Sequence, residues 1–95
     1  MGGFARMSKW LVIAEELIET DGAAPQPRTR VVKELGEQTL ERARLLLHGE
    51  AEKYKPDSFD GRAAVACRDG DRSFLLVAAD RKWHAPCVVR LVERA

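Results

Sequence analysis

Cysteine, asparagine and long apolar runs are scarce or missing in this 95-residue sequence. Two cysteines are too few for a disulfide framework, so we expect reduced thiols in a cytoplasmic protein. No apolar run approaches the roughly 20 residues of a membrane-spanning helix. The first apolar run, Trp10–Ala14, ends at two glutamates and is shorter than the roughly 7–15 residues of a signal-peptide core. The absence of asparagine and the excess of arginine over lysine are typical of a GC-rich bacterial or phage genome.

An excess of one charge is also lacking, because 16 Lys and Arg offset 15 Asp and Glu and leave a net charge of +1. This balance identifies no charged partner, whereas nucleic-acid-binding domains are usually clearly basic. The hydrophobic share of 45% and the charged share of 33% are ordinary for a globular chain. The length predicts one small domain over residues 1–95, with residues 1–7 as a disordered tail.

Catalytic motifs are missing as well. The sequence contains no glycine-rich phosphate loop and no Gly-x-Ser-x-Gly motif. Glu15 and Glu16 are adjacent, so on a strand their side chains point to opposite faces and make no paired carboxylate site. We therefore expect a protein without catalytic activity and without a cofactor.

Four residues, His48, Cys67, His84 and Cys87, are the histidines and cysteines of the chain. A thiol or zinc site at Cys67, His84 and Cys87 is an alternative, because His84 and Cys87 have a knuckle-like spacing of two intervening residues. Cys67 and His48 stand alone, no Cys-x-x-Cys motif occurs, and no third group is evident to orient a nucleophile. We favour structural roles for all four, and we expect no metal.

The C-terminal third predicts an antiparallel meander. Apolar runs at 62–68 and 73–79 flank Asp69-Gly70, a pair that favours a tight hairpin turn. A two-residue turn at this position would pair Arg68 with Asp71. A third apolar run, Cys87–Val92, follows Pro86, which suits the start of a strand or an edge.

The remaining segments predict two strands and one helix. Apolar residues recur at helical spacing from Glu37 to about Tyr54, and Gly49 is a candidate end for this helix after His48. Gly36 is better placed as the helix N-cap than inside a longer helix, which favours strands at residues 9–19 and 29–35. The prediction is an α+β fold, an antiparallel sheet with one main helix in the order β-β-α-β-β-β. The alternative is two N-terminal helices packed on a three-stranded C-terminal meander.

One helix covers only one face of a five-stranded sheet, yet the strand at residues 73–79 is apolar on both sides. An antiparallel strand with one hydrated face normally alternates between apolar and polar residues. We therefore expect a second subunit on the uncovered face, most simply in a homodimer. The expected interface residues are Leu75, Val77, Ala79, Val88 and Val92.

Two further functional hypotheses stand beside the thiol or zinc site. The first is a small cytoplasmic accessory or regulatory protein that acts by protein–protein interaction. The second is a nucleic-acid-binding regulator with an arginine-rich hairpin, since guanidinium groups suit phosphates. The arginines that would bind nucleic acid or another anion are Arg28, Arg30, Arg62, Arg68 and Arg72.

Overall fold

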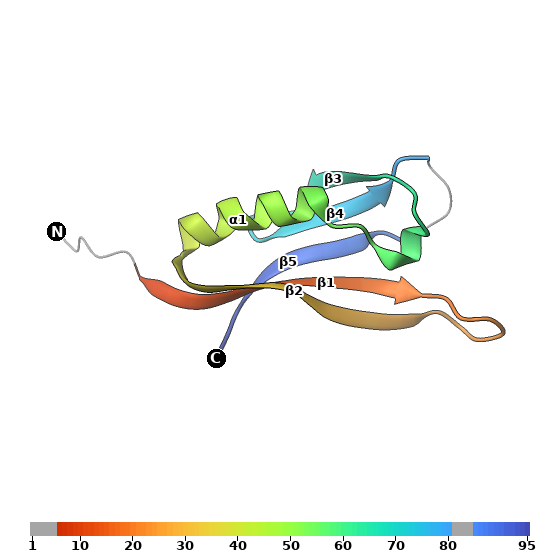
Figure 1. Ribbon diagram of the computed structural model, residues 1–95, viewed down its shortest axis with the longest axis horizontal. Coiled ribbons are helices and arrows are strands. Elements are labelled where there is room, and N and C mark those ends of the chain that lie inside the picture. The colour runs from red at the N-terminus through yellow and green to blue at the C-terminus, as the bar shows by residue number, and fades with distance from the viewer. Residues whose placement is uncertain (1–5, 81–84) are drawn as a thin grey trace.

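The chain folds into one antiparallel five-stranded sheet and one main helix (Figure 1). The computed structural model describes residues 6–80 and 85–95. The strands are β1 (Met7–Ile18), β2 (Gln26–Thr39), β3 (Ala64–Arg68), β4 (Ser73–Ala78) and β5 (Cys87–Glu93). The helices are α1 (Leu40–Lys53) and the short 3-10 helix η1 (Asp57–Phe59). The order confirms the predicted β-β-α-β-β-β arrangement, and the alternative with two N-terminal helices is wrong.

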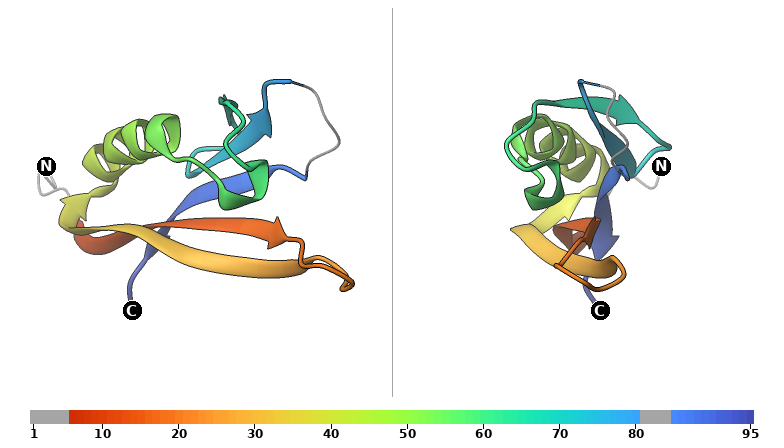
Figure 2. Two further views of the ribbon diagram at one scale, coloured as in Figure 1. Left: turned by 45° about the vertical axis from the view of Figure 1, so that its right-hand side comes forward. Right: turned by 90° about the vertical axis from the view of Figure 1, so that its right-hand side faces the viewer.

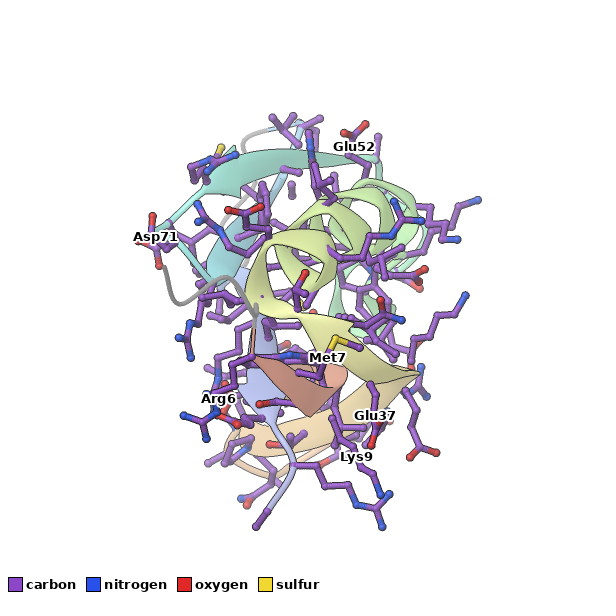
Figure 3. The ribbon with its side chains drawn as sticks, turned by 90° about the vertical axis from the view of Figure 1, so that its left-hand side faces the viewer. Arg6, Met7, Lys9, Glu37, Glu52 and Asp71 are labelled. Atoms are coloured by element: carbon purple, nitrogen blue, oxygen red, sulfur yellow. The ribbon has the colours of Figure 1, made fainter. Side chains whose placement is uncertain are left out.

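The strands lie in the spatial order β2-β1-β5-β4-β3, which leaves β2 and β3 at the two edges. The long β1–β2 hairpin gives the molecule an elongated shape of 57 × 25 × 18 Å. Lys9 and Glu37 are register partners on β1 and β2, and they lie close together in Figure 3. Residues 1–5 of the predicted tail lie outside the described residues, but Met7 already belongs to β1 and pairs with Thr39.

The β1–β2 hairpin contains two irregularities, between Trp10 and Leu11 and between Val12 and Ile13. Each leaves one extra residue on β2, first Leu35 and then Val32, and both pack against the core. Gly36 has a φ of 71°, a conformation that glycine adopts at little cost. The prediction that Gly36 caps the helix is therefore wrong, because β2 continues through this bulged region to Thr39.

Helix α1 begins after Thr39, whose Oγ1 accepts a hydrogen bond from the Arg42 backbone N–H at 3.2 Å. Its buried residues, Ala43, Leu47 and Ala51, recur every four positions and form one apolar stripe. The candidate end after His48 is not used, because α1 continues through Gly49 to Lys53, which agrees with the predicted end at about Tyr54. The backbone N–H of Tyr54 then closes the helix on the Glu50 carbonyl at 3.0 Å.

Replacing Thr39 with alanine is expected to lower the free energy of unfolding by about 1 kcal/mol, because the cap hydrogen bond is lost. Urea unfolding followed by circular dichroism measures this change. Thr39→Ser is the matched control, since it keeps the hydroxyl and should retain most of the stability. Equal losses in the two variants would show that the cap hydrogen bond is not the cause.

The β3–β4 hairpin has a longer connection than predicted. Arg68 pairs with Phe74, not with Asp71, and residues 69–72 form the turn. The Asp69 N–H donates to the Ser73 carbonyl at 2.8 Å, and Gly70 takes a φ of 95°. Asp71 projects at the outer side of this turn (Figure 3). The observed register places the small side chain of Ala66 on the helix side of β3, where it packs against the core.

Both helices lie on the same side of the sheet (Figure 2). The core therefore forms between α1, η1 and one sheet face, where alternate residues of β1, β4 and β5 are buried. Its largest fully buried side chains are Phe59, Leu47, Leu76, Val12, Val89 and Cys87. Within residues 6–80 and 85–95, no helix has the length and apolar character needed to cross a membrane.

Candidate functional site: an uncovered sheet face and a buried carboxylate

The second sheet face carries no helix in the described part of the chain, and we call it the open face (Figure 2). Register partners in an antiparallel sheet share a face, so the pairing identifies its side chains. The apolar residues of the open face are Leu11, Ile13, Leu17, Val31, Val65, Leu75, Val77, Val88 and Val92. They come from all five strands, and the register places Thr29, Glu15, Arg90 and Ser73 among them on the same face.

Several of these side chains are in contact with solvent. Val31 is 54% exposed, Val65 51% and Val77 42%, while Leu75, Val88 and Val92 are half-buried by their neighbours. Ala79, the fifth predicted interface residue, is exposed just after β4, and its N–H donates to the Ala63 carbonyl at 2.9 Å. The structure therefore brings Leu75, Val77, Val88 and Val92 together on one side of the sheet, and no helix within residues 6–80 and 85–95 covers that side.

One ion pair lies within this apolar surface. Arg90 Nε on β5 donates to Glu15 Oε1 on β1 at 2.5 Å, and both side chains are about two-fifths exposed. β1 and β5 are the second and third strands of the sheet, so the pair lies near its middle. The middle of the open face therefore presents a positive and a negative group side by side among valine, leucine and isoleucine, and Lys9, Glu34 and Glu37 lie on the same face toward one end of β1 and β2.

The five arginines predicted to bind anions do not form one surface. Arg28 and Arg30 contact Asp57 at 2.7 and 3.5 Å, and Arg62 contacts Asp80 at 2.8 Å. The other two lie at the β3–β4 hairpin over aromatic rings. Arg68 is 5.8 Å from the centre of the Phe74 ring, and Arg72 is 5.3 Å from that of Trp10.

The two cysteines lie on opposite faces of the sheet. Cys67 is exposed on the open face beside Leu75, whereas Cys87 is fully buried on the helix side beside Leu76. Burial raises the pKa of the Cys87 thiol to about 12, so it stays protonated at neutral pH. His84 lies outside the described residues, and among the residues described no cluster of His, Cys, Asp and Glu could hold a metal ion.

A buried carboxylate on the helix side was not predicted as a site. The side chain of Glu16 is 1% exposed and contacts three other segments of the chain. Its Oε1 accepts from the Ser58 backbone N–H at 2.8 Å. Its Oε2 accepts from Arg28 at 3.2 Å and from the Tyr54 hydroxyl at 3.3 Å. Glu16 thus ties β1 to β2, to the end of α1 and to η1.

These contacts keep Glu16 ionised. Burial by itself would raise the pKa of the carboxyl, but hydrogen bonds from Ser58 and Arg28, with the positive charge of Arg28, outweigh burial and lower the pKa below its ordinary value. A hydrogen bond from Arg28 also lowers the pKa of Asp57. The network stabilises one arrangement of the chain, although Arg28 Nε and the Ser58 hydroxyl are buried without a hydrogen-bond partner among the described residues.

The described surface also has clefts, and two of them contain several charged groups. A groove of about 420 Å³ beside the Glu16 network is lined by both signs of charge, including Arg28, Asp57 and Asp60. A cleft of about 310 Å³ lies between α1 and the β3–β4 hairpin, where His48 stacks on Phe74 at 5.4 Å. Arg44 and Asp71 pair across this second cleft at 3.5 Å. Each cleft is lined by side chains of both charge signs, so the charges do not indicate one class of ligand.

The comparisons with known proteins add no relative to this picture. Searches against protein-family profiles, curated proteins and solved structures found no match for this chain.

Proposed function

We propose that this protein is a small cytoplasmic accessory or regulatory protein that acts by binding protein, without catalytic activity of its own. The contact surface is the open face, which packs against the open face of a second copy. The observation that carries the proposal is a largely apolar sheet face with residues from all five strands, on which Val31, Val65 and Val77 are exposed. Exposed apolar surface of this extent is typical of an interaction site.

The charges on the open face favour a second copy as the occupant. In a twofold dimer, both copies use the same surface, so a contact between two residues occurs twice, once in each direction across the interface. A twofold axis near Glu15 and Arg90 would place each carboxylate beside the guanidinium of the opposite copy. The charges would alternate in sign, and the surrounding apolar side chains would pack on one another.

The size of the open face also fits such a dimer. Neighbouring strands lie about 4.8 Å apart and successive residues about 3.3 Å apart along a strand. The area of the open face, summed over the five strands, is therefore roughly 600 Å² for each copy. Two copies would bury roughly 1,200 Å², which is at the lower end for a stable protein interface. The hydrophobic contribution would come mainly from branched aliphatic side chains.

The cytoplasmic placement is supported by two free thiols that lie on opposite faces of the sheet. The nucleic-acid alternative has less support, because Arg28, Arg30 and Arg62 already pair with carboxylates. Pairing of this kind leaves fewer guanidinium groups to contact phosphates.

Replacing Val77 with aspartate tests the proposed contact. Val77 is exposed at the surface of a single copy, so the fold should tolerate the change, while a charge in an apolar interface is costly to bury. We expect the mass per particle, measured by light scattering after size exclusion, to fall twofold relative to the parent protein. The circular dichroism spectrum should stay unchanged.

Leu45→Asp is the matched control. Leu45 is 66% exposed on α1, on the other side of the sheet, so the same charge there should leave the mass per particle unchanged. A Val77→Asp protein with the parent's mass per particle would contradict the proposal. Equal dissociation in both variants would also contradict it, because the effect would then not depend on the open face.

A further inference from the structure

The two edges of the sheet differ in their protection against pairing with another strand. Edge β2 contains Pro27, a bulge at Gly36 and five charged residues, Arg28, Arg30, Lys33, Glu34 and Glu37. Edge β3 has the sequence Ala-Val-Ala-Cys-Arg, with one charge at its end and no proline or glycine. Natural sheets usually protect their edges with charges, proline or bulges, and β3 has little of this protection.

The hydrogen-bond pattern identifies the outward-facing groups of β3. Asp69 bonds to Ser73 and Ala79 bonds to Ala63, so the odd-numbered residues of β3 make the bonds to β4. The backbone N–H and C=O groups of Ala64, Ala66 and Arg68 therefore point away from β4. Within the described residues, β4 is the strand that pairs with β3, and the outer edge of β3 has no strand beside it.

We propose that β3 pairs antiparallel with β3 of a second copy, about a twofold axis at Ala66. Ala66 then exchanges hydrogen bonds with Ala66 of the second copy, and Ala64 does so with Arg68 on either side. These bonded pairs use only Ala64, Ala66 and Arg68, whose backbone groups point away from β4. The proposed register therefore leaves the hydrogen bonds between β3 and β4 intact. The two sheets become one continuous sheet of ten strands.

The side chains also fit this register. Val65 and Cys67 lie on the open face. In this register, Val65 of one copy lies opposite Cys67 of the second copy, and Cys67 lies opposite Val65. The apolar surface therefore continues from Val77 and Val65 of one copy to Cys67 and Leu75 of the other. On the helix side, the stem of each Arg68 covers Ala64 of the second copy, and the two arginines lie at opposite ends of the ladder.

This edge contact is separate from the packing of open faces. A twofold axis at Ala66 is perpendicular to the sheet and leaves both open faces on the same side, still uncovered. Edge pairing therefore enlarges the surface used in the proposed function and does not depend on it. With both contacts formed, the particle contains more than two copies.

Replacing Val65 with cysteine tests the register directly. Val65 and Cys67 of the second copy form a non-hydrogen-bonded pair, whose Cα atoms lie about 4.5 Å apart. A disulfide forms readily when its Cα atoms are about 4.4–6.8 Å apart. Mild oxidation of the Val65→Cys protein should give a covalent dimer on a non-reducing gel. Cys87 should not take part, because it is fully buried.

Two matched controls establish the register. The parent protein has Cys67 alone on β3, and the Val65→Cys, Cys67→Ser protein has a cysteine at position 65 alone. Neither should cross-link, because each cysteine then faces a residue without a thiol. Cross-linking of the parent through Cys67, or of the double variant through position 65, would overturn pairing about Ala66.

Ala66→Pro provides a second measurement that needs no oxidation. Because the Ala66 N–H points outward, proline removes an edge donor without removing a bond to β4. The mass per particle of the Ala66→Pro protein should fall twofold. A protein that combines Val77→Asp with Val65→Cys should still cross-link, because Val77→Asp disrupts the packing of open faces and not the edge contact. If Val65→Cys gives no covalent dimer and Ala66→Pro leaves the mass unchanged, the edge proposal fails. An edge that instead takes an extended peptide of another protein would give this same negative result.

Discussion

Replacing Phe59 with alanine is expected to lower the free energy of unfolding by about 3–5 kcal/mol. Phe59 is fully buried at the end of η1, where it belongs to the core between the helices and the sheet. Alanine would remove most of its apolar surface and leave a cavity that the surrounding strands cannot close. A domain of this length is stable by about 5–15 kcal/mol, so this loss is a large fraction of the total.

Urea unfolding of the parent and the Phe59→Ala protein, at equal chain concentration, measures the effect. Leu45→Ala is the control, because Leu45 is largely exposed on α1 and its loss should change stability by less than about 0.5 kcal/mol. Phe59→Leu retains more apolar volume and should fall between the two. A loss below about 1 kcal/mol for Phe59→Ala would contradict the packing of η1 described above.

Replacing Glu16 with alanine is expected to have the second large effect, a loss of about 3–5 kcal/mol at neutral pH. The change removes the acceptor for the Ser58 N–H, the Tyr54 hydroxyl and the Arg28 guanidinium. Buried donors without acceptors are costly, and the three segments would lose their shared contact. Glu34→Ala is the control, since its pair with Arg94 is exposed and should contribute less than about 1 kcal/mol.

Glu16 also makes the stability depend on pH. Its pKa in the folded protein lies below 4.5, so the folded state favours the ionised form. The resulting stability is present above the pKa of the unfolded chain and is lost as the pH falls through the folded pKa. The pKa of Asp57 is lowered too, so Asp57 acts in the same direction. Below pH 4.5, the parent should therefore lose stability steadily.

Glu16→Gln separates charge from shape, because glutamine keeps an acceptor oxygen but does not ionise. Its free energy of unfolding should fall less than that of the parent between neutral pH and about pH 3. Urea unfolding at several pH values measures the two slopes. Parallel slopes would show that ionisation of Glu16 does not contribute to the acid sensitivity.

The order of elements could be predicted in part because several elements have their own pattern of apolar residues. The four-residue spacing of Ala43, Leu47 and Ala51 and the apolar runs around Asp69-Gly70 are local signals, whereas residues 9–19 fit a helix or a strand and were predicted as a strand from the position of Gly36. The two-sided apolar character of β4 likewise predicted an uncovered sheet face. Each of these patterns involves residues that are close together in the chain, so it can be recognised in a single sequence.

Exact boundaries and register depended on contacts between distant segments. Gly36 was recognised as a special position, but its positive φ belongs to a bulge whose extra residues reach the core. Thr39 has the preferred N-cap chemistry, and that signal would have located the start of α1. Asp69-Gly70 predicted a turn correctly, but packing against α1 and the core decides that Arg68 pairs with Phe74.

The Glu16 network shows the same limit for a candidate site. The parity of β1 places Glu16 on the same face as Trp10, Val12 and Ala14, and this signal could have indicated a buried carboxylate. Its donors come from β2, the residue after α1, and η1. Only the folded arrangement of these segments brings Arg28, Tyr54 and Ser58 to one carboxyl group.

We propose that further copies of the chain cover the apolar open face, and the number of copies per particle tests this proposal most directly. Light scattering coupled to size exclusion should be recorded for the parent protein over a wide range of micromolar concentrations. We expect a mass of at least twice the 10.6 kDa of one chain, and more than twice when both contacts form. A particle of 10.6 kDa at every concentration would contradict the proposal.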